Sequence, residues 1–590
     1  MHFMVAILIS ATAPCLGGAV YDSLADFPKS MTADYDYIIV GGGTAGSTVA
    51  HRLAEDNETS VLVIEAGGMH TESLNLKVPA WYAREFNTHL DWNYTSVPQP
   101  GLNNRTLPYP RGHVLGGSSC FSGMAITRGG TENWDRIAEV TGDKGWSWES
   151  LLPYMFKNEK LLSPMDHHNT TGQVIPSVHG HDGLVGVTPP SYPSPLDIKV
   201  VNTAKEFKEE FPYTQDMNSG NEIGIGFQLS TIRNGVHENS ATAYLGPGFI
   251  KAHKIDVLLN TRVTRMVPDA SYPGHKGLQF RTVEAANDKL PSYPNRINLT
   301  VRREIILSSG AINTPQLLLL SGVGDSKDLA TLNLTTVLHN PFVGAHLADH
   351  PGVTLSWFVN ETFSNDTAAA LAEWKEKKTG PLTITNTNMR GHFRFSRRVA
   401  EEYKKRFGKD TPGGKDSAHY EIVLLYNSAS TTRATFGMFV TLLNTQSYGT
   451  IKLNTTNPFD PPLINPSFLA KEEDVFVLRE GVRAALRFIQ GKAWTGYLLD
   501  PVAPQPEFDT TDGDIDAWIR TNAASMRHPL GSAAMTKVVD SELRLKGAKG
   551  IRVVDASVFP LVPSAHTMTP VYIIAEKAAA LIMKDWDREN

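Results

Sequence analysis

The chain has 590 residues, more than a single hydrophobic core usually serves, and its 41% apolar and 20% charged residues are those of an ordinary globular protein. We therefore expect two domains or one large two-lobed enzyme. The formal net charge is -6 and no block of like charges occurs, so neither a nucleic-acid partner nor an anionic membrane is expected. No apolar run beyond the first 19 residues reaches about 18 residues, so no membrane-spanning helix is expected.

The start of the chain is typical of a secreted protein. Its first residues, MHFMVAILISATAPCLGGA, are apolar and end in small side chains, which predicts a signal peptide over residues 1–19. Because no Lys or Arg precedes the apolar run, a disordered N-terminus stays an alternative. Cys15 falls in this segment and leaves Cys120 alone, so no internal disulfide is expected. Sequons for N-glycosylation support secretion, and they lie at Asn57, Asn93, Asn104, Asn169, Asn298, Asn333, Asn360, Asn365 and Asn454.

A nucleotide-binding pattern follows Tyr35. A short β-branched strand over Tyr37 to Val40 stops at Gly41-Gly42-Gly43-Thr44-Ala45-Gly46. A helical stretch continues through Leu53, and a second strand runs from Ser60 to Ile64. This order predicts a Rossmann-like dinucleotide-binding unit; a glycine-rich turn in another α/β protein is the alternative.

Each glycine of this motif has a physical role. Gly41 permits the tight turn, Gly43 lets the backbone approach a pyrophosphate at the helix N-terminus, and Gly46 allows the helix to pack closely on the strand. Glu65 follows about 24 residues after Gly41, where a carboxylate can accept hydrogen bonds from a ribose hydroxyl.

Four further stretches complete a longer pattern. YPRGHVLGGSS begins at Tyr109, GAINTPQL begins at Gly310, HPLG begins at His528 and AHTMTP begins at Ala565. Together with GxGxxG, they resemble the glucose-methanol-choline (GMC) family of FAD oxidoreductases over nearly the whole chain after Asp34. Through DWNYTSVPQ, YPRGHVLGGSS, VTGDKGWSW and SVHGHDG, the sequence is most similar to the fungal aryl-alcohol oxidase and pyranose dehydrogenase group.

The resemblance implies an α/β fold (α+β overall) with a discontinuous Rossmann-like FAD-binding domain over residues 34–160, 240–335 and 530–590. A substrate-binding domain, an antiparallel sheet with helices, is expected over 161–239 and 336–529. The polar stretch from Asn360 to Gly413 is expected to include loops over the pocket entrance.

The resemblance also implies which residues bind FAD. Besides the glycine motif and Glu65, they include the region of the Asp555-Ala556 pair, which is expected beside the pyrophosphate and ribitol. The full expected set is Gly41, Gly43, Thr44, Ala45, Gly46, Glu65, Arg111, Leu115, Gly116, Ser118, Ser119, Ser122, Val263, Asp555, Ala556, Thr567, Thr569 and Pro570. Some relatives attach FAD covalently through a histidine where this chain has Phe121, so non-covalent FAD is expected.

Two histidines are the expected catalytic residues. In the family, a histidine at the position of His528 takes the alcohol proton while hydride leaves for flavin N5, and His566 can hydrogen-bond the same oxygen. A pair of structural histidines is the alternative, and no metal site is expected because further ligands at a defined spacing are missing. The remaining loop histidines are expected to be solvated, and they are His167, His168, His179 and His181.

The segment after His566 supports this assignment independently of the family. Thr569 is a natural N-cap, Pro570 suits the first helical position, and an apolar face follows from Val571 to Ile582. The positive end of this helix is therefore expected to favour the negative charge of reduced flavin.

Two positions depart from aryl-alcohol oxidases in a way that concerns the substrate. Gly123 stands where those enzymes have an aromatic gate, and Arg527 stands where they have Phe. The pocket is therefore expected to be roomier and more polar, suited to a sugar, a polar alcohol or a substrate with a carboxylate. An Arg527 side chain turned to solvent is the alternative.

The sequence thus predicts a monomeric, secreted oxidase or dehydrogenase that oxidises a small-molecule alcohol and passes electrons to O2 or a quinone-type acceptor. A hydroxynitrile-lyase-like enzyme that retains FAD and a non-catalytic secreted flavoprotein are the alternatives.

Overall fold

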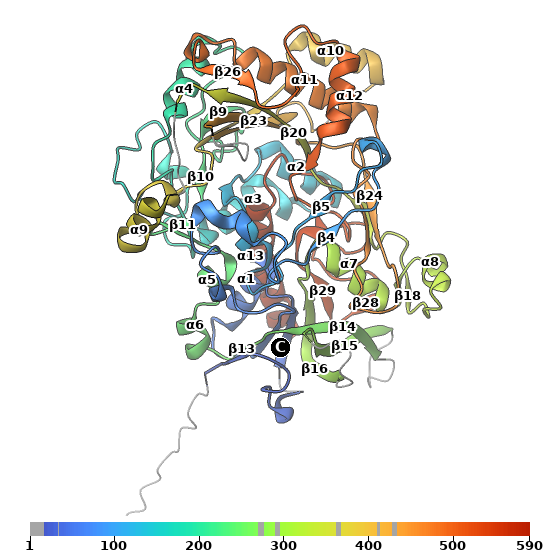
Figure 1. Ribbon diagram of the computed structural model, residues 1–590. Helices are drawn as coiled ribbons and strands as arrows, with labels where there is room; N and C mark the ends of the chain where they lie inside the picture. The colour runs from blue at the N-terminus through green and yellow to red at the C-terminus, as the bar shows by residue number, and fades with distance from the viewer. Residues whose placement is uncertain are drawn as a thin grey trace, which may run out of the picture.

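The computed structural model describes residues 17–32, 35–269, 277–289, 296–361, 367–409, 413–426 and 433–589. Two sheets dominate the molecule, a nine-stranded sheet at one end and a seven-stranded sheet toward the other, with helices against both (Figure 1). Each sheet has its own hydrophobic core. The mixed α/β architecture agrees with the fold class expected from the sequence.

The nine-stranded sheet combines a parallel and an antiparallel part. Its parallel strands are apolar and buried because both faces are covered, as expected for α/β folds. Its main path is β1 (Val20–Tyr21), β13 (Ile255–Leu258), β3 (Val61–Ile64), β2 (Tyr35–Val40), β16 (Arg296–Leu307), β15 (Leu278–Asn287) and β14 (Thr261–Asp269), and the short strands β28 (Ala548–Lys549) and β29 (Ile551–Val553) pair with β15 and β16.

The order of the parallel strands creates a binding edge. β2 pairs in parallel with β3 on one side and with β16 on the other, and β29 pairs in parallel with β16. Successive strands β3 and β13 lie on one side of β2, whereas the later strand β16 lies on its other side. Ligands of such sheets bind beside this point, at the carboxyl ends of the strands. Three stretches singled out in the sequence therefore meet there, beginning at Gly41, Gly310 and Asp555.

The seven-stranded sheet is antiparallel throughout. Its strands are β26 (Leu498–Pro501), β20 (Pro351–Val359), β23 (Thr435–Leu442), β22 (Tyr420–Tyr426), β21 (Met389–Phe393) and β9 (Gly224–Phe227), with β27 (Ala524–Ser525) paired to β20. Apart from β1, every strand of both sheets lies in the segment of the chain expected for its domain. The exact domain boundaries stay a prediction.

Helices cover both sheets. The amphipathic α11 packs on β22 and β23, and α1 packs on α13, which also contacts α3. The helices are α1 (Thr44–Ala54), α2 (Thr131–Thr141), α3 (Trp148–Asn158), α4 (Pro195–Glu206), α5 (Ser240–Tyr244), α6 (Pro247–Ala252), α7 (Gly310–Leu320), α8 (Ser326–Thr331), α9 (Ala368–Lys377), α10 (Arg397–Phe407), α11 (Glu472–Phe488), α12 (Asp512–Asn522) and α13 (Met568–Glu589).

Short strand pairs tie the loops between these elements. They are β4 (Tyr94–Thr95) with β5 (Pro108–Tyr109), β6 (Ala125–Ile126) with β10 (Leu229–Ser230), β7 (Glu159–Leu161) with β8 (Val185–Val187), β11 (Ile232–Arg233) with β12 (Val236–His237), β17 (Val323–Gly324) with β18 (Leu338–His339), and β24 (Gly449–Lys452) with β19 (Ala345–Leu347) and β25 (Leu463–Asn465).

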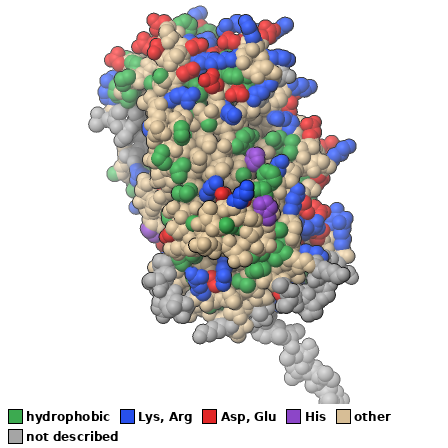
Figure 2. Space-filling model, turned by 90° about the vertical axis from the view of Figure 1, so that its right-hand side faces the viewer, with side chains coloured by type: hydrophobic (Ala, Val, Ile, Leu, Met, Phe, Trp, Pro, Cys, Tyr) green, Lys and Arg blue, Asp and Glu red, His purple; other side chains and the backbone are tan. Residues whose placement is uncertain are grey.

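The surface carries both signs of charge. On the face shown in Figure 2, acidic and basic side chains are interspersed over the end of the molecule formed by α10, α11 and α12. Eight sequon asparagines are exposed, and they are Asn57, Asn93, Asn104, Asn169, Asn298, Asn333, Asn360 and Asn454. The ninth, Asn365, and residues 1–16 of the expected signal peptide lie outside the described residues. Within the described part of the chain, no helix combines the length and apolarity needed to cross a membrane.

Two local expectations were wrong. His179 is buried rather than solvated, because its ring lies 2.8 Å from Glu159 and 2.9 Å from Asp216, which replace the water it loses. His167 and His181 are exposed and His168 is half-buried. Helix α13 begins at Met568, so Thr567, whose carbonyl accepts from Val571 N, occupies the N-cap position in place of Thr569.

A buried ion pair joins α1 to α13. The Arg52 guanidinium donates to both carboxylate oxygens of Glu576, at 2.8 and 2.9 Å, and the Tyr244 hydroxyl donates to the same carboxylate at 2.7 Å. The Arg52 and Glu576 side chains are 6% and 0% exposed. Since α1 carries the glycine motif at its N-terminus, this pair helps to fix the position of the motif.

Glu576→Ala is expected to destabilise the protein by about 3 kcal/mol, because it removes the fully buried counter-charge of Arg52 and leaves this cation only the partly exposed Glu55. The midpoint of thermal unfolding, followed by circular dichroism, measures the effect. Glu401→Ala is the control, since the Arg397–Glu401 pair is 94% and 67% exposed and solvent screens it. Equal midpoints for both variants would contradict the role given to the buried pair.

Candidate active site

A cavity of about 500 Å³ lies at the carboxyl edge of the parallel strands. One side is formed by the ends of β2 and β16 and by the Asp555-Ala556 turn, and the other by side chains of β21, β22 and β23, including Arg390 and Phe439. The cavity is therefore bounded by both sheets. Both histidines expected to be catalytic, His528 and His566, line it.

The glycine motif forms a cradle on the cavity wall. Gly41 has a φ of +100°, which the tight turn after β2 requires. A Cβ on Gly46 would lie 1.9 Å from the Gly41 carbonyl oxygen, so the close packing of α1 needs glycine there. At Gly43 a Cβ would meet nothing closer than the Gly117 Cα at 3.8 Å. The space beside Gly43 is thus open to a ligand at the N-terminus of α1, which fits the pyrophosphate of a dinucleotide.

Two buried carboxylates brace this end of the cavity. Glu65 accepts from the backbone N–H groups of Gly42 and Gly67, at 2.9 and 2.8 Å. Asp555 accepts from Gly310 N at 2.9 Å and from the Thr314 hydroxyl at 2.6 Å. Burial raises the pKa of both carboxyl groups. Both residues line the cavity, where further lone pairs of the carboxylates can accept from ribose or ribitol hydroxyls.

Most residues expected to bind the cofactor line this cavity. They are Gly41, Gly43, Thr44, Ala45, Glu65, Arg111, Ser118, Ser119, Ser122, Val263, Asp555, Ala556 and Thr567. The others lie behind the wall and shape it, and they are Gly46, Leu115, Gly116, Thr569 and Pro570. Gly116, for example, has a φ of +98° at the start of the 3-10 helix Gly117–Phe121.

Phe121 occupies the position through which some relatives attach FAD covalently. Its ring lines the cavity and stacks on that of Phe86, with the ring centroids 5.9 Å apart. Neither ring has a nucleophilic atom. The neighbouring Cys120 is fully buried, and burial raises the pKa of its thiol far above the usual range. Cys120 is thus a small buried side chain, as expected.

His528 is held by a third histidine that the sequence analysis did not identify. His528 Nδ1 lies 3.0 Å from His350 Nδ1, and the two rings meet edge to face. Among the described residues, His528 Nε2 has no hydrogen-bond partner. The ring of His528 also lies 4.8 Å from that of His566, centroid to centroid. The structure therefore brings the two expected catalytic histidines together.

The backbone around His528 is fixed by Asp349. This fully buried carboxylate accepts from His528 N at 2.8 Å and from His350 N at 2.7 Å. The hydroxyls of Tyr109 and Ser525 also donate to it. Asp349 thus joins the end of β5, the short strand β27, the start of β20 and the loop with His528 at one point.

His566 is tied to the seven-stranded sheet. Its Nε2 lies 3.0 Å from each carboxylate oxygen of Glu421 on β22 and in contact with Arg390 on β21. Arg390 donates to Glu421 at 2.7 Å, and His392 lies 3.5 Å from the same carboxylate. The His566 backbone N–H donates to the Thr127 hydroxyl at 2.7 Å. His566 Nδ1 has no partner among the described residues.

Burial and neighbouring charge set the protonation states of this cluster. Burial, reinforced by His566 and His350, holds the pKa of His528 well below its usual value. Burial and the Arg390 cation lower the pKa of His566 to about 4. Burial raises the pKa of Glu421, but His566 and Arg390 outweigh it and hold that pKa well below the usual range. Both catalytic candidates are therefore neutral at neutral pH, beside an ionised Glu421.

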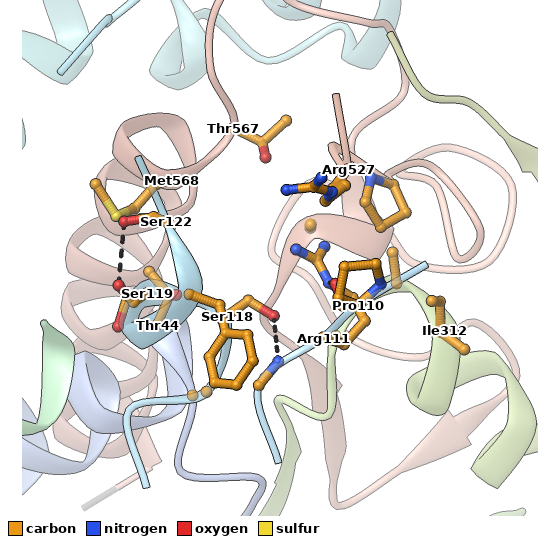
Figure 3. A pocket seen from close by; sticks show the side chains of 18 of the residues that line it. Thr44, Pro110, Arg111, Ser118, Ser119, Ser122, Ile312, Arg527, Thr567 and Met568 are labelled. Atoms are coloured by element: carbon orange, nitrogen blue, oxygen red, sulfur yellow. Dashed lines mark hydrogen bonds between the residues drawn. The ribbon is translucent and has the colours of Figure 1, made fainter. Parts of the chain in front are cut away.

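The two departures from aryl-alcohol oxidases both face the cavity. A Cβ on Gly123 would lie 3.8 Å from the Tyr82 hydroxyl, so an aromatic side chain from another part of the chain stands opposite this glycine. Arg527 is half-buried and lines the cavity, and its guanidinium carbon lies 4.4 Å from the Phe86 ring centre. Arg527 thus borders the cavity, and its role toward the substrate stays a prediction. Figure 3 shows Arg527 and Arg111 across the cavity from Ser122 and Met568.

The polar stretch expected over the entrance has a mixed role. Thr385, Asn386 and Thr387 line the cavity, while the rest of the described stretch forms mainly α9, β21 and α10. Arg390, within β21, is part of the cavity wall itself. Among the described residues, no cluster of three or more His, Cys, Asp or Glu side chains is arranged to hold a metal ion.

Sequence reasoning missed four residues around the histidines, namely Asp349, His350, Arg390 and Glu421. A signal existed for one pair, since Asp349-His350 directly precedes the strand-forming Pro351–Val359 and a buried Asp-His pair is unusual. Arg390 and Glu421 sit singly in apolar strands, where a charged residue is a weak sign of a partner across the sheet.

Comparisons with known proteins agree with this site. Sequence models described as GMC oxidoreductase match residues 35–352 and 445–575. The chain is 35% identical to the dehydrogenase eriK of Hericium erinaceus, covering 98% of both chains, and 38% identical to a pyranose dehydrogenase of Agaricus campestris, covering 95% of both.

Solved structures show the same fold. A formate oxidase of Aspergillus oryzae RIB40 superposes with a TM-score of 0.85 at 25% identity, covering 94% of this chain and 99% of the other. A fungal aryl-alcohol oxidase superposes with a TM-score of 0.81 at 24% identity, over 94% and 99%. GMC oxidoreductases are FAD-binding flavoproteins, and this chain, with its GxGxxG cradle and paired histidines, belongs to the GMC oxidoreductase family.

Proposed function

We propose that the protein oxidises the CH–OH group of a small polar alcohol to an aldehyde or ketone. The observation that carries this proposal is the neutral His528, whose Nε2 has no protein partner, beside His566 on the cavity wall. FAD, when bound, supplies the hydride acceptor, and O2 or a quinone-type acceptor takes the electrons onward. Similar proteins include a pyranose dehydrogenase and a glucose dehydrogenase named for FAD and quinone, and their names support a polar substrate.

His528 is the proposed base. Its Nδ1 shares a hydrogen bond with His350 Nδ1, so a proton on His528 Nδ1 leaves the lone pair of Nε2 for the alcohol. Removal of the hydroxyl proton makes the carbinol carbon a better hydride donor, and the alcohol proton ends on Nε2. Asp349, through the His528 backbone, holds the loop that presents this ring.

His566 is the proposed hydrogen-bond donor to the same oxygen. Two neighbours of Nε2 favour opposite tautomers: Arg390 can only donate and favours the proton on Nδ1, whereas the ionised Glu421 can only accept and favours the proton on Nε2. Because Glu421 already accepts from Arg390, we propose the tautomer with the proton on Nδ1. Nδ1–H then donates to the oxygen on which negative charge develops. The ionised Glu421 forms an ion pair with Arg390, so the Arg390 cation is not left buried without a counter-charge beside the substrate.

We also propose that FAD is held without a covalent bond, in a secreted and glycosylated protein. Phe121 provides no atom for attachment, and the motif residues that line the cavity provide the backbone N–H groups, hydroxyls and carboxylates for the dinucleotide. The exposed positions of eight sequon asparagines support glycosylation.

His528→Ala is expected to retain FAD but to slow flavin reduction by an alcohol by about two to four orders of magnitude, since a general base contributes that much. The measurement is anaerobic mixing with a panel of benzylic, allylic, furanic and sugar alcohols while the oxidised flavin band is followed. Readmission of air then distinguishes an oxidase, whose flavin recovers rapidly, from a dehydrogenase.

The control for this variant is His181→Ala, which changes an exposed histidine away from the cavity. In this variant we expect an alcohol to reduce the bound flavin at the same rate as in the unmodified protein. Flavin bleaching by His528→Ala at a normal rate would overturn the base assignment. Failure of every alcohol to bleach a flavin that dithionite reduces would favour the lyase-like or non-catalytic alternatives.

The pH dependence of flavin reduction should reflect the depressed pKa of His528. A base works only when unprotonated, so a pKa below the usual histidine value keeps it active in mild acid. The rate constant is expected to stay level from about pH 8 to about pH 6 and to fall only at lower pH, whereas a histidine with the ordinary pKa of about 6.5 would lose half its activity by about pH 6.5 and about three-quarters by about pH 6. Stopped-flow reduction over this range tests the expectation.

Gly43→Val is expected to weaken FAD binding without harming the fold of the apoprotein, because the space beside Gly43 is open in the protein itself. The flavin content after purification and the unfolding midpoint of the apoprotein measure the two effects. Gly46→Val is the matched comparison, because its side chain would collide with the Gly41 carbonyl and lower the midpoint of the apoprotein as well. Full flavin content in Gly43→Val would contradict the cradle.

A further inference from the structure

The side chain of Arg527 lacks a counter-charge in the substrate part of the cavity. Among the described residues it forms no ion pair, although it is half-buried. Two other cations on the cavity wall are paired, Arg390 with Glu421 at 2.7 Å and Arg262 with Asp288. A guanidinium removed from water is stabilised by a carboxylate or phosphate, and none of the protein's own groups supplies one here.

The backbone holds Arg527 in this position. Its φ is +65°, in the left-handed region that non-glycine residues seldom adopt. The Arg527 N–H donates to the Ser525 hydroxyl at 2.7 Å, Ser525 in turn donates to Asp349, and Asp349 accepts from His528 N. Because such backbone conformations concentrate where the surroundings impose them, the network that orients His528 also orients Arg527.

An aromatic wall directs the guanidinium. It lies over the face of Phe86, which stacks on Phe121, so the Arg527 side chain is confined from one side. Arg111 lines the same side of the cavity and has no carboxylate partner among the described residues; its Nε donates to the Pro110 carbonyl at 2.9 Å. The nearby Asp349 already accepts four hydrogen bonds from the protein. The region therefore has excess positive charge.

We propose that Arg527 binds the carboxylate of the substrate, so that the preferred alcohol is an anionic hydroxy acid. This inference rests on the proposed alcohol oxidation and specifies its substrate class. Arg527 directly precedes His528, which places the anion-binding group beside the base. The planar guanidinium suits bidentate binding of a carboxylate, and binding at one end of the substrate fixes the orientation of the CH–OH group at the other.

The test compares matched alcohols that differ only in the anion. Suitable pairs are 4-(hydroxymethyl)benzoate with 4-(hydroxymethyl)benzamide, and D-glucuronate with D-glucose. For the pair that reduces the flavin, the ratio of kcat/KM for the acid to that for its neutral partner is expected to be about tenfold or more in the holoenzyme. Arg527→Met is expected to lower this ratio by about tenfold.

Arg84→Met is the matched control. Arg84 also stacks on an aromatic ring, that of Trp81 at 4.0 Å, but it is exposed and lies outside the cavity wall. Its removal changes the net charge equally and is expected to leave the ratio unchanged. A second readout is binding of benzoate against benzamide, measured by perturbation of the flavin absorption band, with weaker benzoate binding in Arg527→Met. Where Arg527→Met fails to retain flavin, Arg527→Gln replaces it.

A ratio of one or less in the unmodified holoenzyme, or a ratio that Arg527→Met does not change, overturns the proposal. Both results require flavin reduction by at least one alcohol and therefore leave the proposed oxidation intact. Absence of flavin reduction by every alcohol, acid or neutral, instead refutes the proposed oxidation on which the inference rests.

Discussion

The position of His528, the proposed base, depends on one buried carboxylate. Asp349 accepts hydrogen bonds from two side-chain hydroxyls and two backbone N–H groups, which come from segments far apart in the chain. A carboxylate so deeply buried is stable only when all its lone pairs are occupied, so each donor is held where it lies. The loop with His528 is consequently rigid although it contains no helix or long strand. Precise placement of a base within hydrogen-bond reach of a substrate needs this rigidity.

The site also depends on both sheets, each with its own hydrophobic core, because each sheet provides one wall of the cavity. The parallel sheet provides the edge where the dinucleotide motif, the Ser308 turn and Asp555 meet, while the antiparallel sheet provides Arg390 and Glu421. Their contacts with His566 cross between the two parts of the molecule. Because a buried charge without its partner is costly, the ionic cluster also fixes how the two sheets face each other. Burial and the Arg390 cation lower the pKa of His566 and keep its ring neutral, although Glu421 acts in the opposite direction.

The sequence predicted the structure best where the residues that carry the chemistry also set the local backbone geometry. The strand, glycine turn and helix around Gly43 follow from side-chain periodicity and from the need for a bare backbone near a pyrophosphate. The closeness of His528 and His566 came from family resemblance alone, since no local pattern reports a contact across a fold. Arg390 and Glu421 escaped because their contact depends on how β21 and β22 pair in the antiparallel sheet, and His350 escaped because its partner His528 lies in a distant loop of the chain. His179 was misjudged because its loop looks polar, although two acidic residues distant in sequence enclose it.

Arg527 illustrates how specificity can change while the reaction stays the same. Its backbone belongs to the Asp349 network and its side chain lines the cavity, so we expect that replacing this side chain alters substrate binding without displacing His528. Tyr82 likewise fills from a different loop the space beside Gly123. The histidines proposed to take the proton and orient the alcohol are held by buried hydrogen bonds, whereas the residues proposed to select the rest of the substrate border open space. A fold with this division can keep one reaction and accept many alcohols.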